Sequence, residues 1–271
     1  MSAQNQTKSV TIATLQKKKA EGEPFSCLTA YDSAFATVLE NAGIDVVLVG
    51  DSVGMVVQGR DTTIPVTLDE MIYHSQIVAR GMKRPMLMAD MPFMSYSTPK
   101  ECLTNAAKLM KEGGAHIVKL EWGELQLDMV ERLSECGVPV CAHLGLTPQA
   151  VYKIGGYRVQ GRDDKTAERL REDALKLEAA GADILLLECV PMKLAAEVTK
   201  SAKIPVIGIG AGPDCDGQIL VLYDILDIAP GKRTRFSKNY MQGAGSIESS
   251  VRSYVEEVES GAFPTAEYAF E

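Results

Sequence analysis

The sequence lacks the features of a disulfide scaffold or a thiolate metal site. Its six cysteines are scattered without any C-x-x-C pair, so structural zinc spacing is absent and buried free thiols in a reducing compartment are expected. No apolar run approaches the ~18 residues that a membrane helix needs. The polar start MSAQNQTKSV also lacks the apolar core of a signal peptide. We therefore expect a cytoplasmic protein that does not enter a membrane.

The chain also lacks an excess of basic residues. It has 28 Lys and Arg against 36 Asp and Glu, and its formal charge is −8. This balance argues against a general affinity for nucleic acid or anionic membranes. Hydrophobic residues make up 46% of the 271 positions, enough for a sizeable core. Because no low-complexity linker divides the chain, we expect one domain spanning residues 1–271.

Eight short apolar runs are present, and helical stretches separate several of them. Continuous apolar runs of this length are typical of strands covered on both faces, as in parallel sheets. The pattern predicts an α/β fold, a (β/α)₈ TIM barrel, with a doubly wound sheet as the alternative. The predicted strands lie within residues 24–32, 44–52, 84–92, 116–122, 138–146, 182–190, 204–212 and 217–225.

Helices are expected between the strands and at both ends of the barrel. Residues 164–183 place Leu170, Ala174 and Leu177 on one helical face. An extra N-terminal helix is predicted within residues 11–22. A C-terminal amphipathic helix is predicted within residues 246–264, and its inward-facing residues are expected to be Ile247, Val251, Tyr254, Val255 and Val258.

Ionisable side chains stand where the predicted strands end. In barrels of this kind the reactive face lies at the carboxyl ends of the strands, so these groups should converge on one acidic pocket. Two of them, Asp32 and Asp224, are interpreted instead as caps of the following helices. The complete set is Asp32, Asp51, Asp90, Glu121, His143, Glu188 and Asp224.

The residue types at these ends favour Mg²⁺. Asp51, Asp90 and Glu121 offer hard oxygen ligands, and two or three carboxylates with water suit this ion. Lys119 lies two positions before Glu121, so both point to one face. The lysine is available either for a substrate carboxylate or for a structural ion pair with Glu121. His143 could bind a substrate oxygen or be an ordinary core residue.

Glu188 ends the apolar run DILLLE. Partial desolvation there would raise its pKa and make it a general base near neutral pH. Each of two glycine-rich segments has two possible roles. IGIGAG either cradles a phosphate or permits close packing. IGGYRVQGR, with Arg158 and Arg162, is either a mobile lid over anionic ligands or an ordinary loop.

A series of motifs resembles the ketopantoate hydroxymethyltransferase (3-methyl-2-oxobutanoate hydroxymethyltransferase) family from about Thr11 to Pro264. The resemblance implies a (β/α)₈ barrel that transfers a hydroxymethyl group from 5,10-methylenetetrahydrofolate to 3-methyl-2-oxobutanoate, through a Mg²⁺-stabilised enolate. It also implies pantothenate and coenzyme A synthesis, and a large homo-oligomer, commonly a decamer. The motifs, in order, are VLVGDSVGMVVQGRDTTIPVTLDEMIYH, ADMPF, KLE, AHLGLTPQ, GGYRVQGR, LLLECVP, IGIGAG and DGQILVLYD.

The same resemblance assigns roles to residues. Asp51 and Asp90 match the metal-binding aspartates, and Glu121 matches the third acidic group of the magnesium site. Both aspartates also match contacts to the keto acid, as do Ser52 and Lys119. His143 matches a histidine lining the substrate pocket, and the proposed proton acceptor corresponds to Glu188.

The chain departs from the family pattern at two positions. Trp122 in KLEWG replaces a usual glycine, which puts loop geometry and the fit of the folate in doubt more than the metal site. Asp227 stands where glycine is common at a helix end, and we expect only a local effect on stability.

Three other functions remain possible on the residues alone. An aldolase would form a Schiff base through Lys119 without a metal. A magnesium barrel of the phosphoenolpyruvate mutase and isocitrate lyase type would act on another keto acid. An inactive barrel would serve as a scaffold, although the intact acidic set argues against that function.

Overall fold

Eight parallel strands close into a barrel in the computed structural model, which describes residues 8–121, 126–231 and 233–271. Each strand pairs with the next, and β8 pairs with β1. All eight lie within the predicted runs, so the (β/α)₈ barrel is confirmed and the doubly wound sheet is wrong. The strands are β1 (Phe25–Thr29), β2 (Val46–Val49), β3 (Met86–Asp90), β4 (Ile117–Glu121), β5 (Val140–Gly145), β6 (Ile184–Glu188), β7 (Val206–Ile209) and β8 (Gly217–Leu220).

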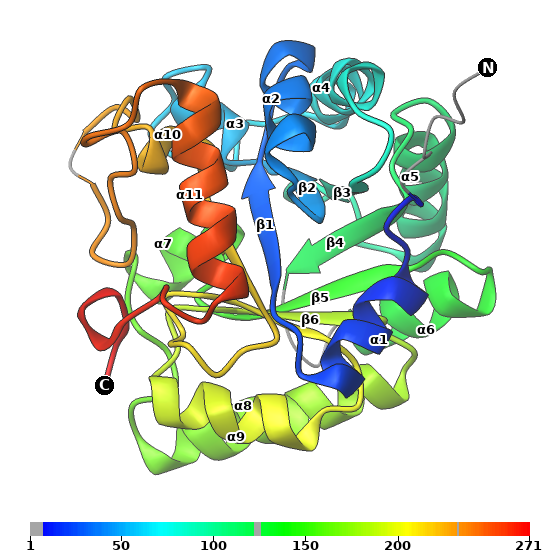
Figure 1. The fold of residues 1–271 in the computed structure, drawn as a ribbon. Coiled ribbons are helices and arrows are strands. Elements are labelled where there is room, and N and C mark those ends of the chain that lie inside the picture. Colours follow the sequence, from blue (N-terminus) through cyan, green and yellow to red (C-terminus); the bar gives the residue numbers. More distant parts are fainter. Residues whose placement is uncertain (1–7, 122–125, 232) are drawn as a thin grey trace.

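Helices surround this barrel (Figure 1). In α8 the predicted face of Leu170, Ala174 and Leu177 is buried, because these residues recur at the helical period. Short helices follow three of the strands: α3 (Val53–Val56), α7 (Val151–Ile154) and α10 (Leu222–Ile225). The longer ones between the strands are α2 (Ser33–Ala42), α4 (Leu68–Gly81), α5 (Pro99–Lys111), α6 (Leu127–Glu135), α8 (Asp164–Ala179) and α9 (Met192–Ser201).

The predicted N-terminal helix is α1 (Ile12–Glu21), which is tied to the amino end of the barrel. Lys18 Nζ lies 2.8 Å from Asp45 Oδ2, and Lys19 Nζ lies 2.7 Å from Asp216 Oδ2. These aspartates immediately precede β2 and β8. The helix therefore lies at the end of the barrel away from the predicted reactive face.

The predicted C-terminal helix is α11 (Ile247–Glu259), which packs beside β1 and α2 (Figure 1). The Tyr254 hydroxyl lies 2.9 Å from the Cys27 carbonyl oxygen and 2.8 Å from that of Gln218, so it fixes the helix to β1 and β8. Four of the five predicted inward residues are buried. The prediction is wrong for Ile247, which is 40% exposed because it begins the helix, a turn before the packed face.

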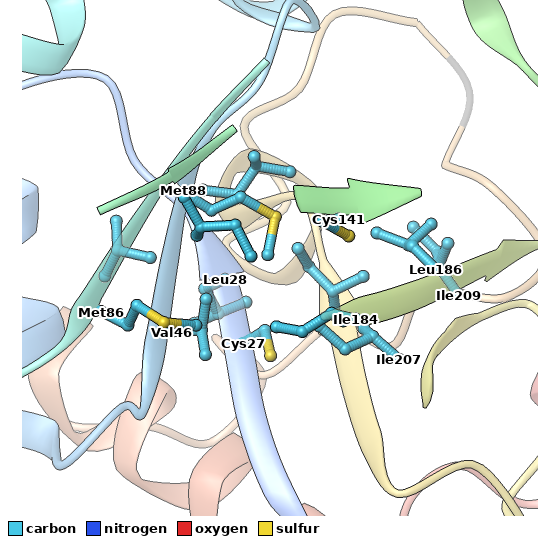
Figure 2. Packing of buried hydrophobic residues seen from close by; sticks show 14 of the residues in the cluster. Cys27, Leu28, Val46, Met86, Met88, Cys141, Ile184, Leu186, Ile207 and Ile209 are labelled. Carbon is cyan, nitrogen blue, oxygen red and sulfur yellow. The ribbon is translucent and has the colours of Figure 1, made fainter. Parts of the chain in front are cut away.

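The barrel interior is apolar along the strands and polar at the mouth, where the carboxyl ends of the strands lie. Figure 2 shows side chains from several strands gathered in the interior, among them Met88, Cys141 and Leu186. Side chains of successive strand residues point alternately to the two faces of the sheet. Asp90, His143 and Glu188 lie two positions after Met88, Cys141 and Leu186, so they face the interior as well, and they line the cavity at the mouth.

The structure bears on two expectations from composition, the state of the cysteines and the absence of a membrane-spanning helix. All six cysteines lie in the described part of the chain and are free, as predicted. Five are buried, but Cys136 is exposed. Within residues 8–121, 126–231 and 233–271, no helix has the length and apolar character needed to cross a membrane.

Candidate active site

A cavity of about 740 Å³ opens at the carboxyl ends of the strands. Asp32 does not line it. Its Oδ1 accepts a hydrogen bond of 2.9 Å from the Phe35 amide and caps α2, as predicted. The capping interpretation is wrong for Asp224, which lies inside α10 and lines the cavity. The structure thus brings together the predicted residues Asp51, Ser52, Asp90, Lys119, Glu121, His143 and Glu188.

Lys119 is the buried cation of this cavity. Strand register places it beside Asp90, and its Nζ lies 2.9 Å from Asp90 Oδ1 but 3.8 Å from Glu121 Oε1. Burial alone would lower the pKa of Lys119, but the negative charges of Asp90, Glu121 and Asp51 outweigh it and raise that pKa. Lys119 therefore stays charged, and Asp90 is its closer ionic partner.

Asp51 follows β2, where the backbone makes a tight turn. The Asp51 amide donates a hydrogen bond of 3.0 Å to Asp90 Oδ2, and the Ser52 hydroxyl lies 2.8 Å from the Tyr31 hydroxyl. A Cβ on Gly50 would lie only 2.7 Å from Ser52 Oγ. Glycine at position 50 thus permits the close approach of the β2 and β3 ends.

Gln149 joins two of the carboxylates, a role that no local pattern in the sequence indicates. Its side-chain Nε2 donates a hydrogen bond of 2.8 Å to Asp51 Oδ2, and its backbone amide donates one of 2.8 Å to Glu121 Oε2. The Tyr96 hydroxyl donates to Gln149 Oε1 at 2.5 Å. Gln149 lies in a short 3₁₀ turn (Pro148–Ala150) after β5, within the HLGLTPQ motif but without helical or strand periodicity.

His143 lies between the lysine and Glu188. Its Nδ1 is 3.2 Å from Lys119 Nζ, and its Nε2 is 3.4 Å from Glu188 Oε2. Burial and the Lys119 charge lower the pKa of His143, which favours the neutral imidazole. With Nδ1 facing the ammonium group, Nδ1 is the acceptor and the ring proton lies on Nε2, toward Glu188.

Glu188 is a carboxyl group that changes its protonation near neutral pH. Burial and the nearby charge of Glu121 raise its pKa to about 8. Its position at the end of an apolar strand produces this desolvation, as the sequence predicted. A carboxyl group in such an environment can exchange a proton with a bound substrate near physiological pH.

The remaining carboxylates fit a divalent cation by their chemistry. Burial and mutual repulsion raise the pKa of Asp51, and burial raises that of Asp90 although Lys119 opposes it. Glu121 Oε1 is buried without a hydrogen bond from any described residue. Among the described residues, no three His, Cys, Asp or Glu side chains are already grouped to hold a metal. Mg²⁺ requires only one or two carboxylates, since water and substrate complete its shell.

The residues of the two glycine-rich segments are not arranged as anion-binding sites. Tyr157 and Val159 of the 154–162 segment line the cavity, but Arg158 and Arg162 are exposed and do not. At Gly210 of IGIGAG, φ is +60° and a Cβ would lie 3.0 Å from the Phe236 ring, which favours close packing over phosphate binding.

The structure describes one of the two positions at which the chain departs from the family pattern. Trp122 lies outside the described residues. Asp227 adopts φ 58° directly after α10, a left-handed conformation in which glycine has no steric cost. Its Oδ2 accepts a hydrogen bond of 2.9 Å from Asn239 Nδ2. This local contact is consistent with an effect confined to the loop.

Comparison with known proteins identifies relatives over nearly the whole chain. Residues 9–266 match the family model described as ketopantoate hydroxymethyltransferase. A protein named 3-methyl-2-oxobutanoate hydroxymethyltransferase from Alkalilimnicola ehrlichii is 58% identical over 96% of this chain and 94% of its own. One of the same name from Marinobacter nauticus is 57% identical over 96% of this chain and 98% of its own.

Solved structures share the fold at low identity. Phosphonopyruvate hydrolase, in a complex with oxalate and Mg²⁺, superposes with a TM-score of 0.61 at 14% identity, covering 95% of this chain and 92% of that one. Oxaloacetate acetylhydrolase gives a TM-score of 0.57 at 17% identity, covering 95% and 100%. At such identities the likeness concerns the barrel alone.

Proposed function

Because the chain belongs to the ketopantoate hydroxymethyltransferase family and is an enzyme of that kind, we propose that it forms ketopantoate from 3-methyl-2-oxobutanoate. The hydroxymethyl donor would be 5,10-methylenetetrahydrofolate, with tetrahydrofolate as the second product, in pantothenate and coenzyme A synthesis. The observation that carries the proposal is Glu188, a partly buried carboxyl group with a pKa of about 8, in the same cavity as Lys119.

The keto acid would bind among the polar groups at the mouth of the barrel. Lys119 supplies a buried positive charge for its carboxylate, an interaction that is strong where water is excluded. Ser52 and His143 supply uncharged polar atoms, and Asp51 and Asp90 complete the contacts. These residues come from strands β2 to β5, so a small substrate can reach all of them in one cavity.

Asp51 and Asp90 would hold Mg²⁺, with Glu121 as the third acidic group. When bound there, Mg²⁺ would act as a Lewis acid on the oxygens of the substrate. Gln149 keeps Asp51 and Glu121 in position, since it donates to both. The unsatisfied Glu121 Oε1 and the raised pKa values of both aspartates support this assignment.

Glu188 would accept the C3 proton of the keto acid. The C3 carbon then forms a bond to the methylene carbon of the folate as one of that carbon's two C–N bonds breaks, and the freed nitrogen takes up the proton held by Glu188. One water molecule cleaves the second C–N bond, which releases tetrahydrofolate and leaves the hydroxymethyl group on C3. Lys119 offsets negative charge as it develops on the substrate. His143 Nε2 lies 3.4 Å from Glu188 Oε2 and is buried without a hydrogen-bond partner among the described residues, so it is available to a substrate oxygen.

A Schiff base at Lys119 is the less favoured mechanism. An amine attacks a carbonyl only when it is unprotonated. The surrounding carboxylates raise the pKa of Lys119, so the ammonium form persists at neutral pH. This environment is the reverse of one that activates a lysine nucleophile.

We also propose that the chain works as a homo-oligomer, for which the family resemblance implies a decamer. Light scattering coupled to size-exclusion chromatography tests this assembly. A mass near ten chain masses is expected, and a monomer at micromolar concentration would contradict it.

The activity is tested by measuring tetrahydrofolate release from methylenetetrahydrofolate and 3-methyl-2-oxobutanoate, first with Mg²⁺ and then with excess EDTA. Release that needs both substrates and stops on chelation supports the proposal. Release that survives chelation would move the mechanism to Lys119, and borohydride trapping of the keto acid would then mark that lysine. No release from folded protein under either condition would reject the proposed reaction.

A further inference from the structure

A second cavity, of about 330 Å³, adjoins the rim of the reactive cavity. Thr234 and Arg235 line both, and they lie in the segment between α10 and α11 at the mouth of the barrel (Figure 1). The inner cavity is acidic, but this outer one is basic. Its described charged lining residues are three cations and one carboxylate: Arg233, Arg235, Lys238 and Glu267.

Arg235 is the available cation among these residues. Arg233 Nη1 lies 3.5 Å from Asp227 Oδ1, and Lys238 Nζ lies 2.6 Å from Glu257 Oε1. Arg235 forms no ion pair with any described residue. Its guanidinium carbon lies 5.4 Å from the centre of the Phe270 ring, and its Nε donates to the Glu267 carbonyl oxygen at 3.5 Å.

The packing on Phe270 suits a carboxylate ligand. A guanidinium group placed over an aromatic ring keeps its edge N–H groups free. These donors match the two oxygens of a carboxylate in a bidentate arrangement. Arg235 is therefore held at the boundary of the two cavities, with donors that no described carboxylate uses.

We propose that Arg235 binds the glutamate carboxylates of the folate donor. The inference rests on the proposed folate-dependent reaction and adds the position of the anionic end. In the inner cavity the keto acid carboxylate would occupy Lys119, and the acidic residues around that lysine, Asp51, Asp90 and Glu121, repel a second carboxylate. The reactive ring system can enter that cavity only if the glutamate end points outward, where Arg235 lies.

The test compares two donors on the full chain. One is methylenetetrahydrofolate, and the other is the same pteridine with its benzoyl group capped as a neutral methylamide in place of glutamate. In the wild type we expect the capped donor to have a KM about 1.5- to 5-fold higher, the range for an exposed ion pair. In Arg235→Gln the KM for the glutamate donor should rise by a similar factor, and the two donors should become equivalent.

Several controls separate binding from structural damage. Arg235→Lys keeps the charge but not the planar fork, so it should restore part of the preference. Arg252→Gln removes an exposed arginine of α11 that pairs with Glu248, and it should leave both KM values unchanged. Calorimetric titration with tetrahydrofolate, without keto acid, should show the same loss of affinity in Arg235→Gln.

The outcomes are distinguishable from failure of the proposed function. If the wild type uses both donors equally well, or if Arg235→Gln weakens both by the same factor, the Arg235 site is rejected while folate dependence stands. If the wild type releases no tetrahydrofolate at all, the reaction itself is rejected. Exchange of the C3 proton of the keto acid with deuterium, measured without donor, should be unchanged in Arg235→Gln.

Discussion

Glu188 combines burial with an unusual proton affinity, and both follow from its place at the end of β6. Replacing it with Gln keeps the shape of the side chain but removes the proton acceptor. We expect kcat to fall by about 10²- to 10⁴-fold, the usual contribution of a positioned general base. The melting temperature should not fall, since burial already disfavours the ionised carboxylate. Steady-state kinetics and thermal unfolding measure the two effects.

The matched control is Glu172→Gln, which changes an exposed glutamate that pairs with Lys176 at 3.5 Å. It should retain full activity. A Glu188→Gln enzyme with a kcat within twofold of the wild type would rule out Glu188 as the proton acceptor.

Gln149 is expected to matter more for stability than a surface amide. Gln149→Ala keeps the backbone bond to Glu121 but leaves Asp51 Oδ2 and the Met91 carbonyl oxygen without their amide donor. Buried groups left unpaired cost roughly 1–3 kcal/mol of unfolding free energy. Urea unfolding should show a loss in this range.

Tyr96→Phe provides the comparison, because it removes the hydrogen bond to Gln149 Oε1 and keeps the amide that binds Asp51. Its loss should be smaller, and the double variant should lose less than the sum of the two, since both changes act on one network. Strict additivity would contradict a shared network.

The acidic residues of the site were predictable because each one ends an apolar strand or lies just beyond its end. Gln149 was not, since its partner Asp51 lies 98 positions away and its turn has no periodic pattern. The same holds for Arg235. Its role depends on Phe270 and on the path of an irregular segment, neither of which is encoded by local spacing.

At the scale of helices, Asp32 belongs to α2 and not to the cavity. Asp32→Ala removes the side-chain acceptor of the Phe35 amide. Loss of such a cap lowers the free energy of unfolding by about 0.5–2 kcal/mol, and activity should stay within about twofold. Asp32→Ser, which can still cap the helix, should lose less. A large loss of activity in a folded Asp32→Ala protein would place Asp32 in the site.

Asp224, in α10, should give a stability effect that depends on pH. Burial raises its pKa from 3.8 to about 6, so its contribution to stability is present below its unfolded pKa and lost as pH rises through 6. Asp224→Asn should therefore be more stable than the wild type at pH 8, by at most about 3 kcal/mol. At pH 5 the advantage should fall to about half.

Urea unfolding of both proteins at the two pH values checks this sign. An Asn variant that is less stable at pH 8 would mean that Asp224 forms a stabilising ionic contact. The sequence suggested a helix cap here, because an aspartate close after a strand usually begins the next helix. The interpretation failed since α10 starts at Leu222, two residues earlier.

Element boundaries were otherwise predictable from hydrophobicity. Each observed strand is shorter than the apolar run in which it was predicted. The contacts of Tyr254 could not be predicted from hydrophobic periodicity. Its inward position in α11 was predicted, but its contacts to the carbonyl oxygens of Cys27 and Gln218 depend on closure of the barrel between β1 and β8.

At the scale of the whole molecule, acidic side chains lie inside the mouth of the barrel and a basic side chain lies at its rim. Six Asp and Glu residues line the cavity, three of them acting on Lys119, and Arg235 lies at its rim. Such crowding of buried negative charge destabilises the folded state unless a cation is added. The fold should therefore gain stability from Mg²⁺ as a whole, beyond any effect on turnover.

We expect the melting temperature to rise with Mg²⁺ in the absence of substrates. A ligand that binds only the folded state at 100 times its Kd contributes about 2.7 kcal/mol. Differential scanning fluorimetry of the EDTA-treated protein, titrated with MgCl₂ at constant ionic strength, measures this shift. Asp90→Asn should show a much smaller one, since it removes one of the two proposed ligands.

The Asp90→Asn protein should itself be less stable than the metal-free wild type. The substitution takes the closer ionic partner from the buried Lys119 ammonium group, a loss only partly offset because burial disfavours ionisation of Asp90. Glu172→Gln, far from the cavity, should respond to Mg²⁺ as the wild type does. An equal shift in Asp90→Asn would place the cation elsewhere, and no shift in any protein would mean that the cation binds only together with the keto acid.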